Sequence, residues 1–222
     1  MSPNSIRAVI FDLDGTLVDS AGEIADALNA AFAELGLAPV PKEKVEAMIG
    51  RGVRVLVERA LGYLQASHDV DDAVRRFESH YARNIGTHAQ LFAGVRTGLE
   101  RLHAAGWPLA VVTNKPRSFT ERLLERLGID RFFRATVTGD DGIRRKPHGD
   151  MLLEACRRMG CEPAASLMLG DSDNDVTAAR EAGCPVWCVP YGYNEGRGAD
   201  ALACDRIVST VDEAAGRLLQ EV

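Results

Sequence analysis

Apolar residues recur at helical spacing after a short apolar run at residues 8–11. The first helical pattern lies between residues 24 and 35. Ser20 and Glu23 precede it with the spacing of a capping box, and Gly36 follows it as a stop signal. Further helical patterns lie at residues 42–50, 53–61 and 71–84. We therefore expect the chain to be helical from about residue 20 to residue 88.

Strand and helix patterns alternate beyond Phe92. Short apolar runs typical of buried strands occur at residues 109–114, 135–141, 166–171 and 186–190. Helical patterns accompany them at residues 94–106, 118–128, 151–160, 176–183 and 211–220. This alternation predicts an α/β domain, a parallel sheet covered by helices on both faces, formed by residues 1–18 and 89–222. The helical block at residues 19–88 then interrupts that domain just after its first strand, as a cap.

Polar residues stand at the carboxyl ends of the expected strands, where parallel sheets bind ligands. They are Asp12 and Asp14 after the first strand, Thr113 and Asn114 after the second, Asp140 and Asp141 after the third, and Asp171 after the fourth. Lys146 follows in the loop beyond the third strand. We expect these segments, which are distant in sequence, to converge on one edge of the sheet.

Asp12 and Asp14 require a positive partner. Alternation along an extended chain places both carboxylates on one side of it. Two like charges ~4 Å apart repel by roughly 4 kcal/mol even at an effective dielectric near 20, so folding alone does not explain the pair. Together with Asp171 they supply the hard oxygen ligands that suit magnesium, while Lys146 and Thr113 add an ammonium and a hydroxyl donor. These groups predict a receptor for a phosphoryl group.

Each of these residues also has an explanation that needs no ligand. The first acidic pair can begin an Asp-Gly turn, strands often end in threonine or asparagine, and Lys146 before a proline is by base rate a solvated surface lysine. The acidic segment at residues 171–175 is not a calcium loop, because Val176 and Ala182 stand where that loop needs glycine and glutamate. Helix capping accounts for Asp173.

Composition and charge narrow the possible functions. The chain has 222 residues, of which 46% are hydrophobic and 26% charged, and its net charge is -6. This describes a globular protein without the basic surface that nucleic-acid binding requires. No apolar stretch reaches the ~20 residues of a membrane helix, so we expect neither nucleic acid nor a membrane as partner. The same lack of a long apolar segment leads us to expect a cytoplasmic protein. The five cysteines lack C-x-x-C spacing, which favours buried free thiols over a zinc ribbon or a disulfide framework.

Four successive segments resemble the motifs of the haloacid dehalogenase-like hydrolases. They are DLDGT at residues 12–16, VVTN at 111–114, Lys146 with Pro147, and GDSDND at 170–175. The resemblance covers the whole expected core and implies a Rossmann-like parallel sheet of strand order 5-4-1-2-3, with a helical cap inserted just after the first strand. The helical block at residues 19–88 lies where that cap belongs.

The resemblance also implies the chemistry of the acidic pair. Asp12 would be the nucleophile that attacks phosphorus and forms an aspartyl-phosphate. Asp14 would protonate the leaving oxygen and then deprotonate the water that hydrolyses the intermediate. Family members that cleave carbon-halogen bonds lack an acid at the position of Asp14, so dehalogenation is disfavoured.

The remaining motif residues would bind metal and phosphate, again as the resemblance implies. Magnesium would be held by the Asp12 side chain, the Asp14 backbone carbonyl and Asp171, with Asp175 as a ligand or a support. The phosphoryl oxygens would be held by Thr113, the Asn114 amide and Lys146.

Further segments resemble those of family members that hydrolyse 2-phosphoglycolate. These segments are LVDSA, IGRG, VERAL, VTNKP and YGYNEG. The resemblance implies 2-phosphoglycolate as the substrate. A small phosphomonoester with a carboxylate needs a cation to bind it, and Arg51, between two glycines of the expected cap, is the candidate, with Arg54 second. An ordinary exposed arginine is the equal alternative. Three alternatives also stay open: a sugar-phosphate phosphatase, a phosphomutase and a binding module without turnover. Periodicity does not decide between phosphatase and mutase, because it does not show whether the cap admits or excludes water. The pattern indicates no particular oligomeric state.

Overall fold

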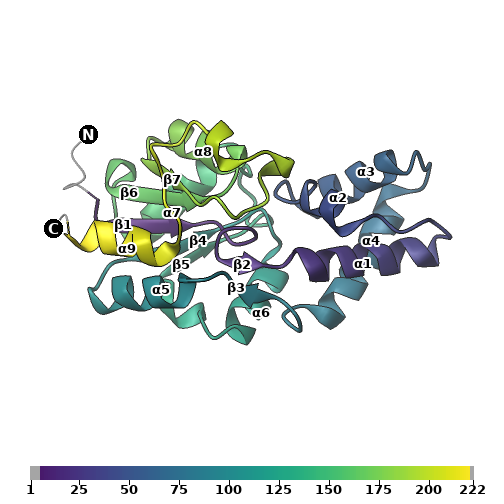
Figure 1. Cartoon of the computed structure of the whole chain (residues 1–222), viewed down its shortest axis with the longest axis horizontal. Coiled ribbons are helices and arrows are strands. Elements are labelled where there is room, and N and C mark those ends of the chain that lie inside the picture. Colours follow the sequence, from purple (N-terminus) through teal and green to yellow (C-terminus); the bar gives the residue numbers. More distant parts are fainter. Residues whose placement is uncertain (1–5, 221–222) are drawn as a thin grey trace.

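A six-stranded parallel sheet forms the centre of the molecule (Figure 1). The computed structural model describes residues 6–220, so residues 1–5 and 221–222 of the expected core lie outside it. From edge to edge the strands are β5 (Ala135–Val137), β4 (Leu109–Val112), β1 (Ala8–Phe11), β6 (Ser166–Gly170), β7 (Val186–Cys188) and β8 (Arg206–Ile207). The first five have the predicted order, read from the opposite edge, and the two-residue β8 adds a strand that we did not expect. The α/β class and the Rossmann-like core are confirmed.

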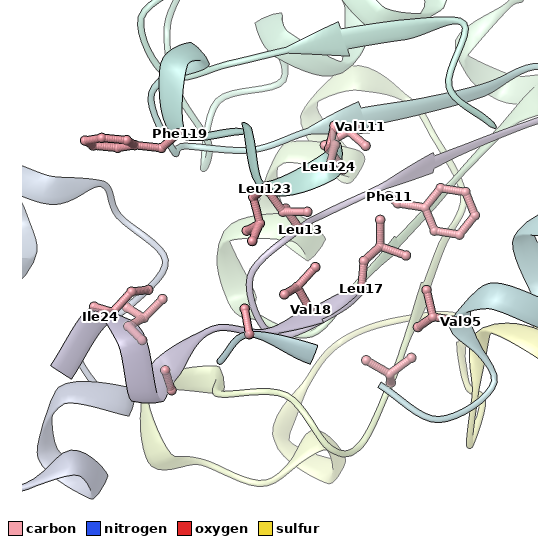
Figure 2. Packing of buried hydrophobic residues seen from close by; sticks show 14 of the residues in the cluster. Phe11, Leu13, Leu17, Val18, Ile24, Val95, Val111, Phe119, Leu123 and Leu124 are labelled. Atoms are coloured by element: carbon pink, nitrogen blue, oxygen red, sulfur yellow. The ribbon is translucent and has the colours of Figure 1, made fainter. Parts of the chain in front are cut away.

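Helices cover both faces of the sheet, because successive strand residues point to opposite sides. In β1, Val9 and Phe11 belong to a cluster with residues of α5 (Val95–Ala104), α6 (Arg117–Arg126) and α9 (Val211–Gln220), part of which Figure 2 shows. Ala8 and Ile10 belong to the other cluster, with residues of α7 (Asp150–Met159) and α8 (Asp173–Ala182). All four side chains of β1 are buried, so this central strand fixes the position of the residues that follow it.

Four helices lie between β2 (Val18–Asp19) and β3 (Gln90–Leu91), two short strands that pair with each other in antiparallel fashion. They are α1 (Ala21–Glu34), α2 (Lys42–Glu46), α3 (Val53–Tyr63) and α4 (Val70–Asn84). Both α1 and α3 pack against α4, and Figure 1 shows the four helices beyond one end of the sheet. The β2–β3 pair therefore lies where the chain leaves the sheet region and returns to it.

The predicted capping box at the start of α1 is wrong. The Ser20 side chain makes no capping hydrogen bond and instead donates to Oδ1 of Asp14 at 2.5 Å. The hydroxyl oxygen of Tyr193 accepts hydrogen bonds from the N–H groups of Ser20 and of Ala21, the first residue of α1. The buried Glu23 carboxylate accepts hydrogen bonds from the backbone N–H groups of Gly86, His88 and Ala89, where the chain returns. Partners remote in sequence have thus replaced the local pair.

The five cysteines are free thiols, as expected. Cys156, Cys184 and Cys188 are buried, while Cys161 and Cys204 are partly exposed. Among the helices of residues 6–220, none combines the length and the apolar character that crossing a membrane requires.

Candidate active site

A cavity lies between the carboxyl end of the sheet and the helical segment. It encloses about 500 Å³, its open mouth included. Its core side is formed by the loops after β1 and β4, with Asp12, Asp14, Thr113, Asn114 and Lys115. Its opposite wall is mostly apolar and is formed by Ile24, Ile49, Gly50, Gly52, Val53, Leu56, Phe77, Tyr81 and, from α6, Phe119. Residues after the first two core strands therefore meet in one place, as the sequence predicted.

Asp12 lies directly after β1 and is almost entirely buried. Its Oδ1 accepts a hydrogen bond from Nζ of Lys146 at 2.7 Å, and the same ammonium donates to Oδ1 of Asp175 at 2.6 Å. Burial raises the pKa of the Asp12 carboxyl well above its usual value; Lys146 opposes this shift, and the charges of Asp175 and Asp171 add to it. Three carboxylates, those of Asp12, Asp171 and Asp175, therefore lie close together, and the single positive charge of Lys146 does not neutralise them.

Lys146 is 4% exposed, so it is not the solvated surface lysine of the alternative explanation. Burial by itself lowers the pKa of its amine, but the charges of Asp12 and Asp175 outweigh burial and raise that pKa. The side chain is therefore an ammonium ion that joins the carboxylate after β1 to a carboxylate in the first turn of α8.

Asp171 lies directly after β6 and is held by two hydrogen-bond donors. Oγ1 of Thr16 donates to Oδ1 at 2.8 Å, and the backbone N–H of Tyr193 donates to Oδ2 at 2.8 Å. A Cβ atom at Gly15 or Gly192 would collide with the Asp171 side chain, and Gly15 also has a φ of +95°, which other residues rarely adopt. Burial raises the pKa of Asp171 to about 7, and the charge of Asp175 adds to the shift. Glycine is therefore needed at both positions to leave room for the Asp171 carboxylate.

Asp12, Asp171 and Asp175 form a cluster in which one carboxylate oxygen from each lies within 4.8 Å of the others. Three buried carboxylates around a single lysine leave excess negative charge, which is costly away from water. Hard carboxylate oxygens in this number suit a divalent cation that keeps part of its water shell. The residues present therefore fit a metal ion.

Asp175 also stabilises the start of α8. Its Oδ2 accepts hydrogen bonds from the N–H and the hydroxyl of Ser172 at 3.1 and 2.8 Å, and from the N–H of Asp171 at 3.2 Å. Asp173, which we expected to cap this helix, is its first residue instead and pairs with Arg197. The expectation for Asp173 was wrong because Ser172 already occupies the capping position.

Lys115 is a site residue that was not recognised from the sequence. Its Nζ lies 3.0 Å from both carboxylate oxygens of Asp14 and 4.7 Å from the centroid of the Tyr81 ring. Burial is the largest influence on the pKa of its amine and lowers it, but Asp14 and Tyr81 together outweigh burial, so the pKa is raised. The positive partners that the acidic pair required are therefore two lysines, Lys146 for Asp12 and Lys115 for Asp14. The signals in the sequence were the position of Lys115 next to Asn114, just after the end of β4, and its place in the VTNKP segment.

Thr113 and Asn114 are both buried at the core side of the cavity. Oγ1 of Thr113 accepts a hydrogen bond from the N–H of Lys115 at 3.2 Å. Nδ2 of Asn114 donates to the carbonyl oxygens of Gly50 and Lys146, both at 2.9 Å. Oδ1 of Asn114 has no hydrogen-bond partner within residues 6–220. The Asn114 side chain thus ties the glycine loop of the helical segment to the core.

Within the described chain, neither Arg51 nor Arg54 lines the cavity. Nε of Arg51 lies 3.2 Å from Oε1 of Glu195, a carboxylate that Arg59 also contacts at 2.7 Å. Arg54 pairs with Asp71 inside the helical segment. Arg51 therefore connects the helical segment to the core loop that carries Glu195.

Asp140 and Asp141, which follow β5, take part in a different network. Oδ1 of Asp140 accepts a hydrogen bond from the N–H of Arg117 at 2.8 Å. Asp141 pairs with Arg117 at 2.6 Å and with Arg158 at 3.1 Å. These two aspartates connect α6 and α7 and do not line the cavity.

The order and geometry of these residues agree with a comparison against known families, in which the family described as haloacid dehalogenase-like hydrolase matches residues 9–189. The chain belongs to the haloacid dehalogenase-like hydrolases. Among relatives within this family, a phosphoglycolate phosphatase of Nitrosospira multiformis is 43% identical, over 99% of this chain and 98% of the relative. Another, from Thiobacillus denitrificans, is 42% identical over 96% of each chain. A solved structure described as a predicted phosphoglycolate phosphatase from Haemophilus somnus has a TM-score of 0.92 at 32% identity, covering 96% of this chain and 98% of that one.

The site of this haloacid dehalogenase-like hydrolase has the parts that displacement at phosphorus needs. One carboxylate, on Asp12, has an oxygen bound by Lys146 and borders the cavity, and a second, on Asp14, lines the same space. Charge that develops on phosphoryl oxygens is stabilised best by fixed donors and cations in a site shielded from water. The roles that the family resemblance implies for individual residues stay predictions.

Proposed function

We propose that this chain is a phosphatase that hydrolyses 2-phosphoglycolate to glycolate and phosphate. The observation that carries the proposal is the buried charge cluster around Asp12, where three carboxylates and Lys146 gather beside the cavity although folding alone gives no reason for them. Family membership and relatives that are named phosphoglycolate phosphatases support the same reaction. We retain the cytoplasm as the expected location.

Asp12 is the nucleophile in this proposal. One of its carboxylate oxygens forms a bond to phosphorus while the bond between phosphorus and the ester oxygen breaks, and Asp14 gives that oxygen its proton. Asp14 then takes a proton from a water molecule, whose oxygen attacks phosphorus and releases the Asp12 carboxylate and inorganic phosphate. Because Lys146 holds Oδ1 of Asp12, we assign the attack to Oδ2.

Magnesium is the metal we propose for the acidic cluster. Asp12, Asp171 and the backbone carbonyl of Asp14 would hold it, and when bound it neutralises charge on the phosphoryl oxygens. Asp175 has the supporting role, because its two oxygens already accept hydrogen bonds from Lys146 and Ser172. The phosphoryl oxygens would be held by Thr113, the Asn114 amide and Lys146.

Residues 19–88 form the cap in this proposal. Several contacts hold the cap on the core. Among them, the carbonyl of Gly50 accepts a hydrogen bond from Asn114, and Arg51 and Arg59 pair with Glu195. The apolar wall that the cap contributes removes water from the reacting groups, which strengthens every charge interaction there.

The same wall argues against a sugar-phosphate phosphatase and a phosphomutase. A sugar brings several hydroxyl groups, and each that is buried without a partner costs about 1 to 3 kcal/mol. A mutase must also bind a second phosphate, whereas Lys115 is the one cationic side chain among the described residues that line the cavity. A small substrate with one further negative group fits this lining better.

Phosphate release from a panel of phosphomonoesters tests the proposal. The panel holds 2-phosphoglycolate, 3-phosphoglycerate, glucose 6-phosphate, β-glucose 1-phosphate and an aryl phosphate, each with magnesium and with excess chelator. We expect phosphoglycolate to have the highest kcat/KM and chelator to abolish turnover. A higher kcat/KM for a sugar phosphate would refute the substrate, and full activity in chelator would refute the metal site.

A further inference from the structure

Lys115 has no role in the chemistry proposed above, although the fold buries it at the site. It is 7% exposed, and its ammonium contacts both oxygens of Asp14 at 3.0 Å. Burying a lysine is costly, and a salt bridge to the acid that must give up a proton is a poor reason to do so. A second function for this ammonium is therefore to be expected within the cavity that it lines.

Tyr81 lies next to Lys115 and has an unused donor. Its ring is 1% exposed, stacks on Phe77 with 5.5 Å between ring centroids, and meets the Phe119 ring edge to face at 5.1 Å. All three aromatic side chains line the cavity. The Tyr81 hydroxyl has no hydrogen-bond partner within residues 6–220, although buried hydroxyl groups are ordinarily paired. An unpaired donor beside a buried ammonium is the combination that an anionic group of a ligand satisfies.

We propose that Lys115 and the Tyr81 hydroxyl form the subsite for the carboxylate of the substrate. This inference rests on the proposed function, since it assigns the second anionic group of the same small molecule. In phosphoglycolate a single methylene carbon separates the carboxylate from the leaving oxygen. Asp14 reaches the leaving oxygen in the proposed chemistry, and Lys115 is in direct contact with Asp14. The carboxylate thus falls within reach of Lys115 when phosphorus faces Asp12.

The subsite is assembled from both parts of the molecule. Lys115 follows β4 of the core, and Tyr81 belongs to α4 of the cap. A carboxylate bound between them joins cap and core, so only a substrate that carries this group completes the closed site. Arg51, the candidate from the sequence, pairs with Glu195 and lies outside the cavity lining, which is why the geometry points to Lys115 instead.

The test compares phosphomonoesters that share a two-carbon chain and differ in the charge at its end. The kcat/KM for phosphoglycolate is measured beside that for ethyl phosphate, which lacks the carboxylate, and that for phosphoethanolamine, which carries an ammonium in its place. We expect Lys115→Met to lower the phosphoglycolate value roughly 10- to 100-fold relative to the ethyl phosphate value, mainly through KM, and Tyr81→Phe to lower it roughly 3- to 10-fold. Turnover of phosphoethanolamine by Lys115→Met should rise relative to phosphoglycolate.

Matched variants control for effects that do not involve the proposed subsite. Lys42→Met and Tyr63→Phe remove the same groups from exposed positions and should leave all ratios unchanged. Lys115→Arg keeps the charge and should keep the preference for phosphoglycolate over ethyl phosphate. Thermal melting identifies variants that fail to fold; Tyr81→Phe removes a single unpaired oxygen and keeps the test available if Lys115→Met is unstable.

Two results overturn different claims. If wild-type protein prefers phosphoglycolate but Lys115→Met and Tyr81→Phe lose activity equally on phosphoglycolate and ethyl phosphate, Lys115 only positions Asp14 and the subsite is refuted while the proposed function stands. If wild-type protein itself shows no preference for phosphoglycolate over ethyl phosphate, the substrate assignment and the subsite both fall.

Discussion

The two sides of the cavity differ in chemistry. The core side carries ionised groups that are buried and paired, such as Asp12 with Lys146 and Asp14 with Lys115. The cap side is formed mainly by apolar side chains, such as Ile24 and Leu56. Ionised groups fixed at the sheet edge can act on any phosphoryl group. An apolar wall discriminates between substrates, because a polar substrate group that is buried against it has no hydrogen-bond partner. Changes to the core residues that act on phosphorus, such as Asp12 and Asp171, should therefore affect all substrates alike. Changes to the residues proposed to contact the rest of the substrate, which are the cap wall and Lys115, should change the order of preference.

The largest effect is expected for Asp12→Asn. The amide is a poor nucleophile, so turnover of every phosphomonoester should fall roughly 10⁴-fold or more, with no covalent phosphorylation of residue 12. Asp14→Asn keeps the nucleophile and should still form an aspartyl-phosphate, which then hydrolyses slowly. Rapid-quench mass spectrometry of both variants measures this. Substantial turnover by Asp12→Asn would disprove the covalent route.

Asp171→Asn should separate activity from stability. Turnover with magnesium should fall roughly 10³-fold because a metal ligand is lost. The pKa of Asp171 is about 7 in the folded protein, whereas an unfolded aspartate titrates near 3.9. Between these values the folded protein holds a proton that the unfolded chain has lost, so metal-free stability should fall as the pH rises from about 4 to about 7.

Thermal melting of metal-free protein from pH 5 to 8 checks this sign. Asp171→Asn, which has no carboxyl to titrate, should remove that fall and gain a few degrees in Tm over wild type at pH 8. Magnesium takes the place of the proton, so it should raise the Tm of wild type more at pH 8 than at pH 5. Equal magnesium effects at both pH values, or a wild-type Tm that rises relative to the variant, would contradict the charge excess at this site.

A smaller and selective effect is expected for Leu56→Ala in the apolar wall. Leu56 is 5% exposed, so truncation should destabilise the protein by about 2 to 4 kcal/mol and widen the cavity. Phosphoglycolate turnover should fall several-fold while bulkier phosphomonoesters gain relative to it. Leu61→Ala is the matched control, because Leu61 is buried in the same helix without lining the cavity. Identical substrate preferences in both variants would show that the wall does not select.

The smallest effect is expected for Arg51→Ala. If Arg51 reads the substrate carboxylate, phosphoglycolate turnover should fall roughly 10- to 100-fold and an aryl phosphate should be spared. Its pairing with Glu195 predicts instead a loss of a few-fold on both substrates, through weaker closure of the cap. Glu195→Gln removes the same pairing from the core and should reproduce the second pattern. A selective loss in Arg51→Ala alone would restore Arg51 as the specificity residue.

The sequence by itself determined the fold class and the acidic strand ends, and its resemblance to the family implied the order of the first five core strands. Asp12 and Asp171 could be predicted because a buried apolar run followed by a carboxylate is a local pattern, and parallel strands bring their ends to one edge. Strand β8 escaped prediction because two residues carry no periodicity. The helical block from residue 20 to residue 88 could be predicted, because its apolar residues keep helical spacing over many turns.

Only the tertiary structure decided which partner each polar group has. Ser20 and Glu23 fit a capping box, yet Ser20 binds Asp14 and Glu23 binds residues 86–89. Lys115 looked like any loop lysine until the fold placed Asp14, 101 positions away, against it. Burial raises the cost of leaving a charge or a donor unpaired, so these groups take the best partner in space rather than the nearest in sequence. The sequence does not show which polar groups will be buried next to one another, and it is this shared burial that determines how they pair.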